Sequence, residues 1–287
     1  MDYKRILTGF IVGFTTYVAM FAGGIWLAAL IFLAVIYLAK EYTEILQHKG
    51  FLPSFKIIVT SSLLFAIIAY TGRLEYTPLA FTAAAFMALL TVLFKGKQPY
   101  IANVATTVFG FLYCGWFPLH LILIRNFGES TSNFMMLPIP HLEGAQYCVL
   151  VFFAVLFTDS FCYFAGCKFG KHKLSPVISP NKTIEGSIGG SIACLIVTIL
   201  LGMMFGIEWY HSLILGAIIA AFAQLGDLCE SMIKRDAGVK DSSNVLPGHG
   251  GFLDRLDSYI LTIPVVYYYT HYFINSTVIT DLFKGLF

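Results

Sequence analysis

Long apolar runs separated by short polar loops make up most of the chain. A membrane-spanning helix needs about 20 apolar residues, within a usual range of about 17–25. Nine runs reach or approach this length, so the pattern predicts an all-α polytopic membrane protein with about nine transmembrane helices. The predicted spans are residues 6–22, 25–39, 57–71, 77–94, 101–124, 145–166, 187–206, 211–230 and 258–275.

The composition agrees with this interpretation. Apolar residues make up 58% of the chain, charged residues only 12%, and the mean hydropathy is +0.79. A soluble domain is usually about 45–50% apolar and about 25% charged. The net charge is only +2 and the basic residues are scattered in short loops, so no nucleic-acid partner is expected. The six cysteines form no CxxC pair, which favours buried thiols over a zinc site or a disulfide framework.

Lysine and arginine are divided unevenly between alternate loops. With nine spans and the N-terminus inside, 15 of the 18 basic residues fall in inside segments and 3 in outside segments. Short cytoplasmic loops of membrane proteins carry an excess of basic residues. The sequence therefore predicts a cytoplasmic N-terminus. It also places the two most polar loops, 168–186 and 231–257, together on the cytoplasmic side, where CTP and ATP occur.

Ionisable residues become more frequent in the spans after the fifth one. From Asp159 onward the spans and their ends carry them, whereas earlier span interiors carry almost none. A lone carboxylate at mid-membrane costs about 2.5–3.5 kcal/mol, so Asp159 should face the bundle interior and a cation. A purely structural hydrogen bond is the alternative for this residue. We expect scaffold helices over 1–125, an external loop over 126–144 and a catalytic transmembrane region over 145–287.

The segment 231–257 and the span before it hold the densest charge, with nine charged residues between Glu230 and Asp257. Asp227, Glu230 and Lys234 are spaced to share one face of a helix that extends this span. The alternative for Glu230 and Lys234 is an ion pair on a solvated helix end, worth about 0.3–0.5 kcal/mol. Carboxylates bind divalent metals and basic groups bind phosphate, so the segment suggests a site for a nucleoside triphosphate.

A glycine-rich turn ends this segment, and Asp254 and Asp257 follow it on the first turn of the last span. Because Gly250 and Gly251 carry no side-chain bulk, their backbone N–H groups can approach phosphate closely. A helix N-terminus also favours an anion. The two carboxylates would repel phosphate unless a metal lay between them, so we predict a bridging Mg²⁺ ion. The predicted ligands are Asp227, Asp254 and Asp257, with Asp159 and Glu230 as further candidates.

The other polar loop reads SPVISPNKTIEGSIGGS. Lys182 and Thr183 suit a phosphate contact, and Glu185 is expected to orient Lys182 or to assist the metal site. The glycines that follow allow close helix packing, and packing alone is an equally good explanation for them. The predicted phosphate-binding residues of both loops are Ser179, Asn181, Lys182, Thr183, Glu185, Gly250 and Gly251.

The stretch from Ser231 to Asp257 resembles the signature of the phosphatidate cytidylyltransferase (CDP-diacylglycerol synthase) family at every fixed position. Asp159 with Tyr163 and Gly166, the SPNKTIEG loop and the GDLCES segment resemble other motifs of that family. The resemblance covers about residues 145–275. The matched signature positions are Ser231, Ile233, Lys234, Arg235, Lys240, Asp241, Ser243, Leu246, Pro247, His249, Gly250, Gly251, Phe252, Asp254, Arg255, Leu256 and Asp257.

The resemblance implies the reaction CTP + phosphatidate → CDP-diacylglycerol + pyrophosphate. It also implies Mg²⁺, a candidate second cation such as K⁺, and a homodimer in the lipid bilayer. A bacterial inner membrane with the active site facing the cytoplasm is the expected location. The candidate catalytic residues are Asp227, Lys234, Arg235, Lys240, Asp241, His249, Asp254, Arg255 and Asp257.

Two alternatives stay open at this point. One is a related CTP-dependent enzyme that acts on another lipid, such as a CDP-archaeol synthase or a polyprenol kinase. The other is an ion-coupled transporter with Asp159 and Asp227 as ion ligands, although the one-sided charge in the loops disfavours it. A CDP-alcohol phosphotransferase is not expected, because its DG…AR…G…D…D pattern is absent. The isolated histidines 120, 172, 211 and 271 are given no role.

Overall fold

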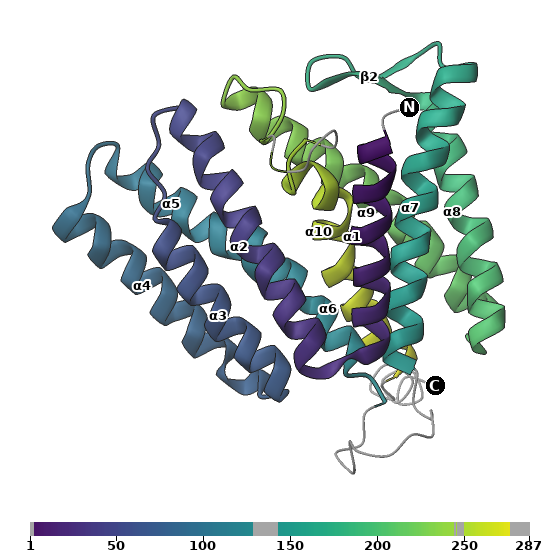
Figure 1. Cartoon of the computed structure of the whole chain (residues 1–287), viewed down its shortest axis with the longest axis horizontal. Helices are drawn as coiled ribbons and strands as arrows, with labels where there is room; N and C mark the ends of the chain where they lie inside the picture. Colours follow the sequence, from purple (N-terminus) through teal and green to yellow (C-terminus); the bar gives the residue numbers. More distant parts are fainter. Residues whose placement is uncertain (1–2, 129–142, 244, 246–249, 276–287) are drawn as a thin grey trace, which may run out of the picture.

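The computed structural model describes residues 3–128, 143–243, 245 and 250–275. These residues form a helical bundle with one small β-hairpin (Figure 1). The α-helices are α1 Tyr3–Ala22, α2 Gly24–His48, α3 Phe55–Thr71, α4 Thr77–Lys95, α5 Tyr100–Gly110, α6 Phe117–Arg125, α7 Glu143–Phe169, α8 Ile184–Phe205, α9 Trp209–Asp236 and α10 Leu253–Tyr269. The strands are β1 Lys173–Ser175 and β2 Ser179–Thr183, and short 3-10 or π segments are Leu74–Tyr76, Phe111–Trp116 and Thr270–Ile274.

The predicted all-α membrane fold is confirmed. Six helical segments in the described part of the chain are long and apolar enough to cross a membrane: Gly24–His48, Leu74–Lys95, Tyr100–Arg125, Glu143–Phe169, Ile184–Phe205 and Trp209–Asp236. The segments Gly13–Ala22 and Phe55–Thr71 are apolar but shorter. The figure of nine spans and the cytoplasmic N-terminus stay predictions.

Two helices run further than their apolar stretches indicate. α2 continues past residue 39 to His48, because Tyr42 and Ile45 keep one face of its second half buried. α9 continues past residue 230 to Asp236. Polar residues at a helix end allow that end to lie in water, and they leave its backbone hydrogen bonds intact. The link between α9 and α10 is therefore residues 237–252, which is shorter than the predicted loop.

The β-hairpin was not expected from the sequence. Its strands pair antiparallel, with Lys173 opposite Thr183. Thr183 then caps α8, because its side-chain oxygen accepts a hydrogen bond from the Gly186 amide at 3.1 Å. The hairpin thus fixes where the polar loop ends and where α8 begins.

Glycines set the close spacing of α7, α8 and α9. A Cβ atom at Gly190 of α8 would lie 2.2 Å from the sulfur of Cys162 on α7. One at Gly216 of α9 would lie 2.2 Å from the hydroxyl of Thr198 on α8. A larger residue at either position would force the helices apart, so close packing does account for glycines in this region.

The polar segments gather at one end of the bundle. The hairpin, the C-terminal ends of α2 and α9 and the start of α1 all lie at the upper end of the molecule in Figure 1. This arrangement brings the two polar loops of the sequence to the same end of the helices.

Candidate active site

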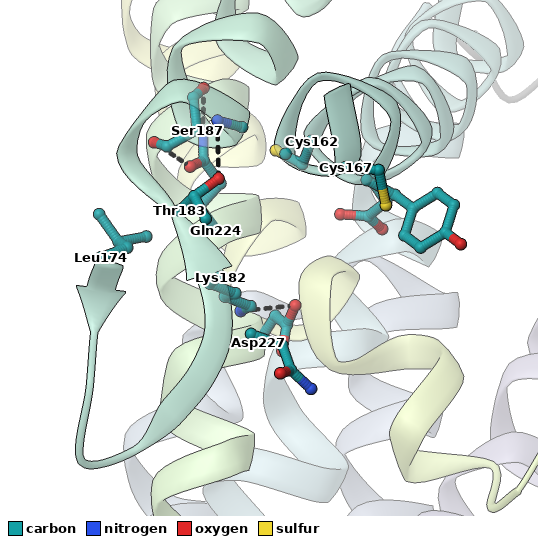
Figure 2. Close-up of a pocket in the computed structure, with 13 residues that line it drawn as sticks. Cys162, Cys167, Leu174, Lys182, Thr183, Ser187, Gln224 and Asp227 are labelled. Atoms are coloured by element: carbon teal, nitrogen blue, oxygen red, sulfur yellow. Dashed lines mark hydrogen bonds and ion pairs between the residues drawn. The ribbon is translucent and has the colours of Figure 1, made fainter. Parts of the chain in front are cut away.

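A cavity of about 520 Å³ lies between α7, the β-hairpin, α8 and α9 (Figure 2). Small-molecule sites usually have volumes of about 300–1,000 Å³. The cavity brings together predicted residues from three separate parts of the sequence. Its walls are formed by Asp159, Cys162, Tyr163, Gly166, Cys167, Leu174, Asn181, Lys182, Thr183, Gly186, Ser187, Gln224 and Asp227.

Lys182 and Asp227 form an ion pair in this cavity. The Lys182 Nζ atom lies 2.6 Å from Asp227 Oδ2, with Lys182 supplied by β2 and Asp227 by α9 (Figure 2). Their side chains are 25% and 32% exposed. The Lys182 Nζ atom itself is buried while it is paired. Both side chains line the cavity, so a phosphate could take the place of Asp227 at the ammonium group, and a cation the place of Lys182 at the carboxylate, once the pair opens.

Gln224 holds the α8 and α9 walls of the cavity together. Its side-chain oxygen accepts a hydrogen bond from the Ser187 hydroxyl (Figure 2). Its Nε2 atom also donates to Ser191 Oγ at 3.1 Å. It lies one helical turn before Asp227 on α9. The amide is a cross-link between two helices and keeps the Asp227 face of α9 turned toward the cavity.

Asp159 lines the same cavity from α7. Its carboxylate accepts a hydrogen bond from the Ser258 hydroxyl of α10 at 3.2 Å. It also interacts electrostatically with Asp227 and Lys182. Asp159 thus has a hydrogen bond to α10 and a nearby ammonium group, and its role as a metal ligand or as a purely structural residue stays a prediction.

Asp257 of α10 joins these carboxylates. It interacts electrostatically with Asp227, Glu230 and Asp159, and the four residues are called the acidic cluster below. α10 can come this close to α9 because Gly226 has no side chain: a Cβ atom there would lie 2.4 Å from the Asp257 carbonyl oxygen. Neighbouring ionised carboxylates repel one another, so the cluster favours nearby cations.

Lys234 forms a second, closed ion-pair group on the same face of α9. Its Nζ atom lies 2.7 Å from Glu230 Oε2 and 2.6 Å from Asp254 Oδ1. The Lys234, Glu230 and Asp254 side chains are 11%, 0% and 13% exposed. The Glu230–Lys234 pair therefore exists at the predicted spacing, but it is buried and does not sit on a solvated helix end.

Asp254 anchors the link between α9 and α10 to this group. Its Oδ2 atom accepts hydrogen bonds from the Gly251 amide and the Ser242 hydroxyl, both at 2.9 Å. Burial alone would raise the pKa of Asp254, but hydrogen bonds from Lys234 and the Gly251 amide outweigh it and lower the pKa to about 2. Asp254 therefore stays ionised and acts here as an acceptor for the loop.

Within the described residues, no three His, Cys, Asp or Glu side chains converge closely enough to hold a metal ion. The chemistry of the acidic cluster nevertheless fits Mg²⁺, which prefers carboxylate oxygens. Asp227 and Asp257 both belong to that cluster, whereas Asp254 is engaged with Lys234 and the loop. The Mg²⁺ site stays a prediction.

Glu185 is directed at the hairpin and not at Lys182. Its carboxylate lies 2.6 Å from His172 Nδ1 and accepts a hydrogen bond from the Lys171 amide at 3.0 Å. The contact between Glu185 and His172 also gives a partner to a histidine that the sequence left isolated. Glu185 therefore holds Lys171 and His172, the residues just before strand β1, in place.

The remaining predicted residues lie mainly on the surface. Arg235 is exposed and donates to the Val239 carbonyl oxygen at 2.9 Å, which closes the end of α9. Other exposed candidates are Lys240, Asp241 and Arg255. Ser179 is partly exposed in β2. His249 lies outside the described residues, so its predicted role in the phosphate region stays a prediction.

Sequence analysis missed Glu41 of α2. This residue lies in the predicted scaffold region, yet it contacts the link between α9 and α10 through Ser242, Ser243, Phe252 and Leu253. The available signal was an acidic residue that follows the apolar run after a single lysine, Lys40. The partners, about 200 residues further along the chain, could not be identified from spacing.

Comparison with protein families gives a match over nearly the whole chain. A model described as "Cytidylyltransferase family" matches residues 3–273, so it includes the first five predicted spans as well as the loops. The resemblance seen in the sequence from about residue 145 therefore extends to the N-terminal helices.

Several curated proteins are similar in sequence to this chain. A phosphatidate cytidylyltransferase of Synechocystis sp. is 34% identical over 94% of this chain and 96% of its own length. The chloroplastic phosphatidate cytidylyltransferase 5 of Arabidopsis thaliana is 32% identical over 92% of this chain and 70% of its own. A phosphatidate cytidylyltransferase of Staphylococcus saprophyticus is 48% identical over 47% of this chain and 52% of its own.

Proposed function

Because the chain belongs to the cytidylyltransferase family, we propose that it transfers the cytidylyl group of CTP to phosphatidate. The products are CDP-diacylglycerol and pyrophosphate. The match along the full chain and the names of the relatives favour this enzyme over a CDP-archaeol synthase, a polyprenol kinase or a transporter.

The cavity-lining pair of Lys182 and Asp227 is the observation that supports this function most directly. It puts a phosphate-binding ammonium group and a carboxylate in one cavity at the end of the bundle where both polar loops lie. The reaction must bring two anions together, the lipid phosphate and the triphosphate. A site with exchangeable positive and negative groups meets that requirement.

In the proposed reaction, an oxygen of the phosphatidate phosphate attacks the α-phosphorus of CTP. A new P–O bond forms, and the bond from the α-phosphorus to the leaving pyrophosphate breaks. The attacking phosphate is already ionised at neutral pH, so no strong general base is required. Lys182 binds a phosphate oxygen once it is released from Asp227, and Thr183 and Asn181 line the same wall. The exposed Lys240 and Arg255 are proposed to attract the triphosphate from solution.

We expect Asp227 and Asp257 to hold a Mg²⁺ ion, with Asp159 beside them. The mutual repulsion of the acidic cluster and the preference of Mg²⁺ for carboxylate oxygens support this assignment. Asp254, which sequence analysis also predicted as a ligand, instead holds the loop through Lys234, Ser242 and Gly251. When bound, the ion would offset charge on the triphosphate and on the departing pyrophosphate. A second cation such as K⁺ is an additional candidate.

The enzyme is an integral membrane protein, and we propose that its polar end faces the cytoplasm of a bacterial cell at the inner membrane. The excess of basic residues in the loops at that end supports this orientation. A homodimer is proposed from the family resemblance. Cysteine labelling from each side of sealed vesicles at Lys240→Cys, in a background without accessible native cysteines, would test the orientation.

The function is tested with the full chain purified in detergent, using CTP labelled in the cytidine base and phosphatidate in mixed micelles. We expect labelled CDP-diacylglycerol and pyrophosphate in equal amounts, and no product when phosphatidate is omitted or a chelator removes Mg²⁺. Diacylglycerol, a polyprenol and an ether-linked archaeal phosphatidate analogue are the matched alternatives. Turnover of one of these lipids in place of phosphatidate would contradict the proposal.

A further inference from the structure

The first turn of α10 carries part of the acidic cluster, yet it has no capping side chain of its own. The residue before the helix is Phe252, which makes no side-chain hydrogen bond to the helix end. The first backbone N–H groups of a helix need acceptors, and they are costly to bury without them. The residue that precedes α10 in the sequence therefore provides no side-chain acceptor for the first N–H groups of this helix.

Glu41 of α2 supplies the missing acceptors from the opposite half of the chain. Its Oε1 accepts from the Phe252 amide at 2.8 Å, and its Oε2 accepts from the Leu253 amide at 2.6 Å. A carboxylate at a helix N-terminus is also stabilised by the helix dipole. Glu41 is 0% exposed. A fully buried charge is retained only where its hydrogen-bonding capacity is used, and here two backbone donors use it.

Two serines extend this contact to the loop before α10. Ser243 donates to Glu41 Oε1 at 2.5 Å, and Ser242 lies 3.1 Å from Glu41 Oε2. The Ser242 hydroxyl is also 2.9 Å from Asp254 Oδ2, so its single proton is shared between the two carboxylates. A Cβ atom at Gly251 would lie 2.8 Å from Glu41 Oε2 and would collide with Ser242, so the glycine is required for this approach.

The contact continues from Glu41 into the site. Asp254, held by the same serine, binds Lys234, and Asp257 one turn later belongs to the acidic cluster. An aromatic contact also holds the loop against α2. The Tyr37 and Phe252 rings stack with centroids 5.6 Å apart.

We propose that Glu41 is a positioning residue of the transferase: it caps α10 from α2 and holds Ser242, Ser243 and Phe252 of the preceding loop so that Asp254 and Asp257 keep their places. Glu41 does not touch the cavity that we assign to substrates, so it acts through the loop. The proposed effect on catalysis rests on the proposed function, whereas the contact itself does not. The N-terminal helices are accordingly part of the active-site architecture.

The test compares Glu41→Gln, Glu41→Asp and wild type, with Glu44→Gln as the matched control. Gln is isosteric with Glu but turns one acceptor into an NH₂ group that faces a backbone N–H. Asp keeps both acceptors on a shorter arm. Glu44 lies one turn along the same helix, with its side chain 49% exposed. The milder variant Ser243→Ala removes one partner if the Glu41 variants fold poorly.

Hydrogen exchange of the full-length protein in detergent reads the contact directly. In Glu41→Gln we expect the Phe252 and Leu253 amides to exchange about tenfold faster or more, the usual size of the loss of a hydrogen bond to a charged group. We expect kcat/KM for CTP to fall about 10- to 100-fold. Glu41→Asp should recover part of both effects, and Glu44→Gln should show neither.

Three results would overturn the proposal. One is exchange at Phe252 and Leu253 that equals wild type in Glu41→Gln. Another is faster exchange with kcat/KM unchanged, which would make Glu41 a purely structural cap. The third is an activity loss fully explained by a smaller folded fraction, with wild-type kinetics in the folded protein. If wild type itself forms no CDP-diacylglycerol, the proposed function fails, but the exchange measurement still decides whether the cap exists.

Discussion

Two lysines of this protein each pair with a carboxylate of α9, Asp227 for Lys182 and Glu230 for Lys234, yet their surroundings differ. Lys182 meets Asp227 in a cavity where both side chains are about a quarter to a third exposed. Lys234 meets Glu230 and Asp254 where exposure is between 0% and 13%. A pair that lines a cavity can exchange partners with a ligand at modest cost, whereas a pair enclosed by the fold cannot be opened without leaving charges unsolvated. The first pair is suited to chemistry and the second to holding the fold.

Asp227→Asn should produce the largest effect, because Asp227 is both the partner of Lys182 and part of the acidic cluster. We expect kcat to fall by about 10³-fold or more if this carboxylate helps to hold Mg²⁺. The measurement is CDP-diacylglycerol formation over a range of Mg²⁺ concentrations. Asp236→Asn, an exposed change on the same helix, is the control. Wild-type turnover in Asp227→Asn would remove this residue from the metal site.

Lys234→Met should mainly reduce stability. Removing the ammonium group leaves Glu230 and Asp254 buried without their cation, and breaking a buried ion pair in this way typically costs about 3–5 kcal/mol. Thermal unfolding in detergent, compared with wild type and with Arg235→Met at the exposed neighbouring position, measures the loss. A Lys234→Met protein with normal stability but no activity would place this lysine in the chemistry and would break the comparison.

Lys182→Met should show the opposite behaviour. Because the pair is partly exposed, we expect a small change in stability, of about 1 kcal/mol or less. We expect kcat/KM for CTP or phosphatidate to fall about 100-fold, since a charged contact to phosphate is lost. Steady-state kinetics with each substrate varied separately, together with the unfolding temperature, distinguish the two effects. Equal loss of stability in both lysine variants would contradict the contrast drawn above.

Glu185→Gln should have the smallest effect. The carboxylate braces the hairpin through His172, whose side chain is 74% exposed, so the contact is weak. We expect less than a tenfold change in kcat/KM, about 1.4 kcal/mol at most. A larger loss that varies with Mg²⁺ concentration would instead support the original idea that Glu185 assists the metal site.

The sequence was informative where residues are neighbours along one helix. The spacing of Asp227, Glu230 and Lys234 predicted a shared face of α9, and the structure has the Glu230–Lys234 ion pair on it. It could not predict which lysine would be buried, because burial depends on how α10 packs against α9. Contacts between distant segments, such as Lys182 with Asp227, were likewise beyond the pattern.

The N-terminal region shows the same limit more clearly. Its apolar runs predicted helices, and the structure has them. The pattern gave no reason to expect that α2 would continue to His48, or that Glu41 would reach α10. A single polar residue at the edge of an apolar run is equally compatible with solvent and with a buried cap. Only the arrangement of the helices distinguishes these cases.

The absence of a side chain at Gly226 has a consequence for how exact the site can be. The α9 backbone rests against the carbonyl oxygen of Asp257, so the gap between the two helices is set by main-chain contact. Main-chain atoms cannot rotate aside as side chains do. The distance between the helix backbones that carry Asp227 and Asp257 is thus set by main-chain packing. We expect it to be retained when lipids, substrates or temperature shift the surrounding side chains.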